Sequence, residues 1–282
     1  MKATNPAGYS DNGRHADVEA HSLPRVSRSD VGARIDAVGS RVVQVDAGLV
    51  RIEQRMRIAG PAIGTDVSGP ACIVASVRVA RGEVDYLCGR TQVTAPAAFD
   101  LVLPPCAIVQ VRLERTDATS IAVAFRPGRG DRVPRHALLL PAAADRPLRT
   151  VDDARARLGD VDDGVEIGRT ADPRSLAARA KQIVDAHYAG RLEIGRLARR
   201  LHVTGPALSR AFRAAYGIPP VRYRHQVRIV DALVRLAEGS VPADVFQEVG
   251  FDDLSRFYKV FRTVACAAPG TYRPRTSRNA KT

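Results

Sequence analysis

Residues 197–223 read LARRLHVTGPALSRAFRAAYGIPPVRY, and residues 249–262 read VGFDDLSRFYKVFR. The two stretches match at a fixed offset of 49 residues. The matched pairs are Leu208 with Phe257, Arg210 with Lys259, Phe212 with Phe261, Arg213 with Arg262, Pro220 with Pro269, Tyr223 with Tyr272 and Arg224 with Arg273. Upstream of the turns the offset is 48, so the second turn carries one extra residue. This repeat predicts two copies of one helix–turn–helix unit.

Helical periodicity extends on both sides of the repeat. We expect helices at 175–189, 192–201, 206–216, 221–238, 242–248 and 253–264, with helix 221–238 joining the two units. The later helix of each unit has an apolar inner face, formed by Leu208 and Phe212 in the first and by Phe257 and Phe261 in the second. Its outer face is polar and basic. A charged outer face is usually only solvated, so a function needs support from elsewhere in the sequence.

The distribution of charge supplies that support. The chain has 282 residues, with 43 Lys and Arg against 30 Asp and Glu, and a net charge of +13. Residues 1–170 carry 23 basic and 21 acidic residues, whereas residues 171–282 carry 20 basic and 9 acidic residues. The excess positive charge therefore lies in the helical third of the chain, which favours a polyanionic partner there.

A basic helix that follows a tight turn is suited to reading DNA. Such a helix fits the major groove, and an Arg guanidinium can bond two acceptors of one guanine edge. Arg224, Arg273 and Arg275 suit phosphate contacts, which set the register without reading sequence. Two such helices held rigidly can enter adjacent major-groove segments, about 34 Å apart on one face of the DNA.

The C-terminal region resembles the AraC/XylS-type transcription regulators. The resemblance rests on residues 197–223, on RIVDALVRL at 228–236, on residues 249–262 and on PGTYR at 269–273. It implies a domain with two helix–turn–helix motifs that binds double-stranded promoter DNA, commonly as an activator that touches RNA polymerase. By position it assigns base reading to Pro206, Ser209, Arg210 and Arg213 in the first motif, and to Leu254, Ser255, Tyr258, Lys259 and Arg262 in the second.

Two positions of the second motif depart from the family pattern. Phe246 stands where the family usually has a small Ala, at the close approach of the two helices, and Cys266 stands where it usually has Gly. A bulky Phe should widen the helix packing or rotate the recognition helix. We therefore expect base reading mainly from the first motif, with the second mainly holding the backbone.

The sequence of the N-terminal part has a pattern typical of short β-strands. Between residues 25 and 130, apolar and β-branched runs alternate with turn signals such as Gly60-Pro61, Arg81-Gly82 and Pro104-Pro105. This spacing is typical of a sandwich or barrel. The resemblance implies a cupin-like β-barrel that binds an effector or dimerises, so the fold class is α+β multidomain.

We expect a tail at 1–24, the β-domain at 25–148, a linker at 149–174 with a short helix at Val151–Leu158, the DNA-binding domain at 175–275 and a basic tail at 276–282.

The sequence lacks the residue patterns that several kinds of site and segment require. The β-domain has no H-x-H pair and no C-x-x-C pair, so we expect neither a metal nor a cofactor. No apolar run approaches the length that a membrane span needs, and the polar N-terminus lacks a signal sequence, so we expect a cytoplasmic protein. An apolar barrel interior could hold a small organic effector, or it could simply be a filled core.

Three functions remain in competition. The first is a sequence-specific regulator, acting alone or as a homodimer. The second is a β-barrel enzyme fused to a DNA-binding module, which would need a reactive thiol at Cys72, Cys88 or Cys106. The third is an architectural DNA binder without base discrimination. Cys72 and Cys106 lie in apolar strands or beside prolines, so we expect no enzymatic activity.

Overall fold

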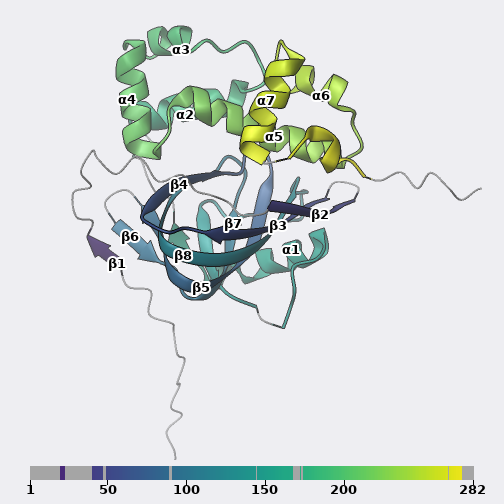
Figure 1. Ribbon diagram of the computed structural model, residues 1–282. Coiled ribbons are helices and arrows are strands. Elements are labelled where there is room, and N and C mark those ends of the chain that lie inside the picture. The colour runs from purple at the N-terminus through teal and green to yellow at the C-terminus, as the bar shows by residue number, and fades with distance from the viewer. Residues whose placement is uncertain are drawn as a thin grey trace, which may run out of the picture.

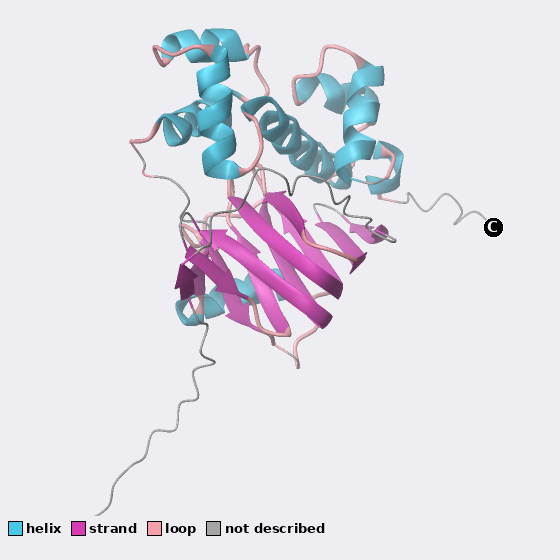
Figure 2. Ribbon diagram, turned by 60° about the vertical axis from the view of Figure 1, so that its left-hand side comes forward, coloured by secondary structure: helices cyan, strands magenta, loops and turns pink. Residues whose placement is uncertain are grey.

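The computed structural model describes residues 20–22, 40–46, 49–88, 91–143, 145–167, 172, 174–265 and 267–274. A β-rich N-terminal part lies beneath a helical C-terminal part (Figure 1). Figure 2 shows the same two layers from another side, with the C-terminal helices gathered over one end of the sheet and α1 lying apart from them against the sheet. The expected α+β architecture is confirmed: a β-rich domain precedes a helical domain that contains two helix–turn–helix motifs.

The N-terminal part is a single antiparallel sheet. Its strands are β1 (Ala20–Ser22), β2 (Ser40–Asp46), β3 (Leu49–Arg57), β4 (Ala62–Val67), β5 (Cys72–Cys88), β6 (Thr91–Thr94), β7 (Ala98–Leu103), β8 (Ile108–Phe125), β9 (Ala137–Pro141) and β10 (Val165–Ile167). The main order is β10-β9-β7-β5-β8-β3-β2, while β4 pairs with β8 and β6 pairs with β5 and β1. Because β5 and β8 are long and pair along most of their length, the sheet can curl around one apolar cluster.

The strand β5 runs through a position where the sequence predicts a turn. The pairing of β5 with β8 shifts register on both sides of Arg81, and Gly82 has a φ of 85°. A Cβ at Gly82 would lie 2.4 Å from the carbonyl oxygen of Glu114. Arg81-Gly82 therefore forms a bulge within one continuous strand, which only glycine allows.

The segment at 149–174, expected to be a linker, packs on the sheet over much of its length. Its helix α1 (Val151–Arg157) begins with a capping box between Thr150 and Asp153, and a 3-10 turn, η1 (Leu158–Asp163), leads to β10 beside β9. The buried Arg157 guanidinium lies 2.7 Å from the buried Asp100 carboxylate of β7. These contacts anchor residues 150–167 to the β-rich part.

The C-terminal part has the helices that the periodicity predicts, with ends that differ by a few residues at most. They are α2 (Leu176–His187), α3 (Ile194–Arg200), α4 (Gly205–Tyr216), α5 (Pro220–Ala237), α6 (Pro242–Glu248) and α7 (Leu254–Ala265), followed by the 3-10 turn η2 (Pro269–Tyr272). Twelve of the 18 residues of α5 are buried. This helix is therefore the central support of the domain.

The two turns repeat the same backbone geometry. His202 and Gly250, which match at the offset of 48, both have a positive φ, of 58° and 89°. The amide after each of them donates to a carbonyl five residues back: Val203 to Ala198 at 3.0 Å and Phe251 to Phe246 at 2.8 Å. Both units thus close their first helix in the same way.

The two parts of the chain share an interface. Val67 and Ile108 of the sheet join the cluster of α2–α5, and Val50 and Ala124 join the cluster of α5–α7. Polar contacts add to this: Lys181 Nζ donates to the Cys106 carbonyl at 2.6 Å, and Gln110 Nε2 donates to a carbonyl of α4 at 3.3 Å. The helical domain is therefore docked on the sheet.

We predict that Gly250→Ala destabilises the protein by about 3 kcal/mol, the sum of left-handed strain and overpacking. A Cβ at Gly250 would lie 1.9 Å from the carbonyl oxygen of Ala189 in the loop after α2. Gly239→Ala is the matched control, because Gly239 also has a positive φ of 103° but an added Cβ meets nothing within 4 Å. It should cost about 1–2 kcal/mol. Urea unfolding followed by circular dichroism measures both, and equal losses would contradict the steric argument.

Candidate nucleic-acid interface

The first recognition helix, α4, presents a short polar face. Thr204 caps its start, with the hydroxyl accepting from the amide of Ala207 at 3.3 Å. Leu208 and Phe212 are fully buried beneath the helix. Of the predicted base-reading residues, Pro206, Arg210 and Arg213 are exposed and Ser209 is half-buried. The face expected from the sequence is therefore open to a partner.

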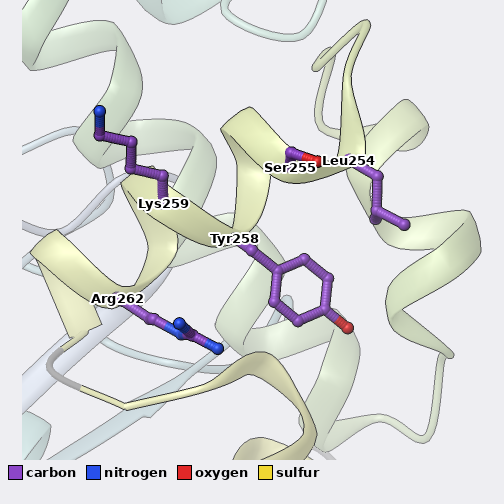
Figure 3. A pocket seen from close by; sticks show the side chains of 5 residues that line it. All are labelled: Leu254, Ser255, Tyr258, Lys259 and Arg262. Carbon is purple, nitrogen blue, oxygen red and sulfur yellow. The ribbon is translucent and has the colours of Figure 1, made fainter.

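The second recognition helix, α7, has the same design. The carboxylate of Asp253 accepts from the amide of Arg256 at 2.5 Å at the start of the helix, and Phe257 and Phe261 are fully buried. Five side chains line an open hollow of about 560 Å³ on its outer side (Figure 3). They are the predicted residues Leu254, Ser255, Tyr258, Lys259 and Arg262. The structure thus brings together all five residues assigned to this motif.

Phe246 occupies the place that Ala198 has in the first unit. Its ring lies 6.5 Å from that of Phe257 and is half-buried, whereas Ala198 is fully buried. The extra residue of the second unit, Asp252, stands between this turn and the cap at Asp253. Cys266 lies outside the described residues.

Arg224 has a different role from the one that the sequence predicts. Its Nε donates to the Tyr188 carbonyl at 2.9 Å, its Nη1 donates to the Leu192 carbonyl at 2.6 Å, and its Nη2 donates to the Gly190 carbonyl. Because every nitrogen of this guanidinium already donates to the α2–α3 loop, Arg224 is a structural clamp in place of a phosphate ligand. Arg273 is exposed, and Arg275 lies outside the described residues.

Arg228 extends the clamp to the second unit. Its Nε donates to the Tyr188 carbonyl at 2.7 Å, and its guanidinium lies 5.3 Å from the ring centroid of Phe251. Desolvation by burial lowers the pKa of Arg228 to about 10. Since Phe251 follows the second turn, α5 holds parts of both units through one side chain.

Asp231 connects the helices to the β-rich part. Its carboxylate is completely buried and accepts from Arg126 Nη2 at 2.7 Å, from the Tyr188 hydroxyl at 3.0 Å and from Arg235 Nε at 3.0 Å. Arg235 also pairs with Glu248 of α6 at 2.6 Å. Burial beside this carboxylate raises the pKa of Tyr188 to about 12. One carboxylate thus links the end of β8, the α2–α3 loop, α5 and α6.

Sequence reasoning missed part of the basic surface. Arg199 and Arg200 lie in the last turn of α3, and Arg256 lies in the first turn of α7; all three are exposed. The repeat predicts that these residues lie near the recognition helices. It does not predict that their side chains point outward, because that depends on where each helix begins and ends.

A second candidate site lies inside the β-rich part. A cavity of about 780 Å³ is lined by residues of the sheet and by residues of α4, α5 and α7. Arg213, assigned to base reading, is also among its lining residues, together with Arg222 and Gln226. The last turn of α4 therefore lies beside this cavity.

Cys72 and Cys106 are poorly suited to nucleophilic chemistry. Burial raises the pKa of the Cys72 thiol to about 12 and that of Cys106 to about 11. The thiolate is the reactive form, so both are weak nucleophiles near neutral pH. In the part of the chain that the structure describes, no three His, Cys, Asp or Glu side chains gather as metal ligands. None of the described helices combines the length and apolarity that a bilayer crossing requires.

Comparison with known proteins agrees with this geometry. A family model described as a helix-turn-helix domain matches residues 197–275. The fold and its exposed recognition helices define a helix–turn–helix DNA-binding module. More particularly, residues 197–275 form an AraC-type helix–turn–helix domain, the kind found in DNA-binding transcription regulators.

Solved structures give more distant similarities. Unsaturated fatty acid-bound ToxT from Vibrio cholerae is 12% identical, with a TM-score of 0.45 over 82% of this chain and 96% of that chain. The C-terminal domain of the response regulator AraT from Geobacillus stearothermophilus is 20% identical, with a TM-score of 0.35 over 40% of this chain and 97% of that one. The yesN C-terminal domain from Fusobacterium nucleatum is 25% identical, with a TM-score of 0.32 over 34% and 94%. No curated protein matches the chain.

We predict that Asp231→Asn lowers the free energy of unfolding by about 3 kcal/mol, because the buried carboxylate balances two guanidinium groups. Asp162→Asn is the matched control. Asp162 pairs with Arg132 at 3.0 Å, but both side chains are largely exposed, at 76% and 62%. An exposed pair contributes at most about 1 kcal/mol. Denaturant unfolding measures the two losses, and a loss for Asp231→Asn no larger than the control would show that the network adds no stability.

Proposed function

We propose that this protein is a sequence-specific transcription activator whose two recognition helices enter adjacent major-groove segments of promoter DNA, the first mainly reading bases and the second mainly holding the backbone. The observation that carries the proposal is the clamp of Arg224 and Arg228, which attaches both helix–turn–helix units to one helix, α5. A rigid pair of units enters two groove segments on one DNA face without paying an ordering cost at binding.

Within this proposal the outward side chains take different roles. Pro206, Ser209, Arg210 and Arg213 of α4 read bases, and Arg210 suits a guanine edge because it is exposed in the middle of the helix. The five residues that line the hollow on α7 face a second groove segment. Arg273 and Arg275, joined by the exposed Arg199, Arg200 and Arg256, supply phosphate contacts.

The remaining parts of the chain fit a regulator. We assign effector binding or dimerisation to residues 25–148, the connection to 149–174 and DNA binding to 175–275. RNA polymerase is the proposed partner at the promoter, and the cytoplasm is the proposed compartment. The cavity of about 780 Å³ supports a small organic effector as a second function, because its size suits a drug-sized molecule.

We predict that Arg210→Ala relaxes sequence preference more than Lys259→Ala does. Losing a bidentate base contact should cost about 1–3 kcal/mol on the selected site and little on random DNA. Lys259→Ala should weaken binding to both DNAs similarly, because the second motif mainly holds the backbone in this proposal. Binding to selected and randomised duplexes, measured by fluorescence anisotropy, tests both variants. Equal relaxation by the two would refute the division of roles, and Arg132→Ala, remote from the interface, serves as the control.

We also predict that binding to selected DNA exceeds binding to random DNA by on the order of a thousandfold at physiological salt. Both affinities should fall steeply as salt rises, because phosphate contacts release counterions. The measurement is a salt titration of the full-length protein on both duplexes. A ratio near one at every salt concentration would instead identify an architectural DNA binder.

A further inference from the structure

The outer face of the sheet carries four arginines on two strands that flank β8. They are Arg55 and Arg57 of β3 and Arg78 and Arg81 of β5. On β8, Thr119 is in register with Arg55 and Arg78, and Asp117 is in register with Arg57 and Arg81. Residues in register on neighbouring strands point to the same face of a sheet. We call these four arginines the arginine patch.

The arginine patch is open to a partner. Met56 lines the cavity, so its neighbours Arg55 and Arg57 point to the opposite, outer face. On this outer face α1 covers a different part of the sheet, where Val123 of β8 packs in one cluster with Ala154 of α1. The patch lies farther along β8 than that cluster, and all four of its arginines are exposed.

The patch is separate from the recognition helices. The two ends of β8 contact the helical domain, because Ile108 belongs to the cluster of α2–α5 and Ala124 to the cluster of α5–α7. Thr119 lies about 17 Å along an extended strand from Ala124. Figure 1 shows β5 and β8 extending away from the C-terminal helices. The arginine patch therefore does not belong to the DNA interface proposed above.

Asp117 balances only part of this charge. Its carboxylate lies 3.3 Å from Arg55 Nη2 and 3.6 Å from Arg57 Nε. The hydrogen bond from Arg55, together with the charges of Arg57 and Arg81, holds the pKa of Asp117 below its usual value. Among the described residues no ion pair involves Arg78 or Arg81. Four guanidinium groups thus gather around one carboxylate.

The two rows of the patch differ at their centre. Asp117 places a carboxylate between Arg57 and Arg81, whereas Thr119 places a hydroxyl between Arg55 and Arg78. A carboxylate held above Thr119 would repeat the arrangement of the Asp117 row. The planar guanidinium group is suited to carboxylates, which it can bind through two parallel hydrogen bonds. One exposed pair contributes little, but a carboxylate between two guanidinium groups forms part of a network.

We propose that the arginine patch binds a short acidic segment of a partner protein, with one carboxylate of the segment above Thr119, between Arg55 and Arg78. The internal carboxylate of Asp117 shows that this surface engages the same chemical group. The inference goes beyond the DNA-binding function proposed above and does not depend on it.

Acidic residues beside the patch disfavour a larger polyanion. Glu83 of β5 pairs with Glu114 of β8, and both are exposed. They point to the outer face, because Val84 and Leu113 beside them belong to the inner apolar cluster. A DNA duplex or an anionic bilayer that covered the arginines would also cover these carboxylates and Asp117. A short segment with spaced carboxylates contacts the arginines without reaching Glu83 and Glu114.

The first test uses two fluorescein-labelled peptides, one of four Glu-Ser repeats and one of four Gln-Ser repeats. Each is titrated with the full-length protein at low ionic strength, and binding is followed by fluorescence anisotropy. We expect the Glu peptide to bind at least about tenfold more tightly than the Gln peptide. This advantage should disappear at high salt, because exposed charges are screened.

A double variant locates the binding on the protein. Arg55→Gln combined with Arg78→Gln should weaken binding of the Glu peptide about tenfold. The matched control is Arg129→Gln combined with Arg132→Gln, which removes the same charge from exposed positions between β8 and β9. The control should leave the affinity close to that of the wild-type protein, which excludes a general effect of net charge.

A single variant tests the position above Thr119. Thr119→Glu supplies a carboxylate from the chain itself between Arg55 and Arg78, so it should weaken binding of the Glu peptide about tenfold. Thr119→Gln has nearly the same size without the charge and should bind the peptide almost as the wild-type protein does. Circular dichroism checks that each variant is folded.

Several results would overturn the proposal. They are equal binding of the two peptides by the wild-type protein, unchanged affinity of the folded double variant, and unchanged affinity of Thr119→Glu. Tighter binding of random duplex DNA or of phosphatidylglycerol vesicles, lost in the double variant, would assign the patch to a nucleic acid or a membrane. Self-association lost in the same variant would assign it to a second copy of the chain. Binding to selected DNA, measured in parallel, should be unchanged in the Thr119 variants, which separates this proposal from the DNA-binding function.

Discussion

The fully buried carboxylate of Asp231 is the constraint on which the arrangement of both domains depends. It accepts from Arg126 of the β-rich part, Tyr188 of the α2–α3 loop and Arg235 of α5. A buried charge is tolerated only when its partners are in place, because an unpaired charge in a protein interior is costly. The sheet, the first helix–turn–helix unit and α5 must therefore be assembled together, and Arg235 extends the same demand to α6 through Glu248.

The turns of the two helix–turn–helix units both need one residue with a positive φ, and they use different residues for it. The first turn uses His202 in the left-handed region, while the second uses Gly250, where a side chain would collide with the Ala189 carbonyl. The second unit is thus pressed against the loop that Arg224 and Arg228 hold. In the first turn His202 adopts the same left-handed conformation and its side chain is exposed. The two turns therefore share the amide-to-carbonyl bond that closes the first helix but differ in packing.

The helices were predictable because their periodicity depends on near neighbours, such as Leu208 with Phe212. Four outward residues of α7, Ser255, Tyr258, Lys259 and Arg262, were predictable for the same reason, since a helix puts them on one face, whereas Leu254 was assigned by the family resemblance. The role of Arg224 was not predictable, because its acceptors are backbone carbonyls more than thirty residues away, which no side-chain pattern encodes. The sequence at Arg81-Gly82 predicts a turn for a similar reason. A glycine indicates that a positive φ is possible, but it does not indicate whether the chain reverses direction or continues as a bulged strand.

The position of α5 explains how the cavity and the two recognition helices, α4 and α7, can influence each other. Gln226 and Val230 face the cavity, while Arg224 and Arg228 hold the loops of the two units on the same helix. Asp231 prevents α5 from sliding alone, since any displacement would strip a buried carboxylate of its donors. A ligand that changes the packing under α5 must therefore shift the helix together with both units or leave all of them in place. Coupling between the two sites would follow from one shared, rigid element and would need no chain of intermediate contacts.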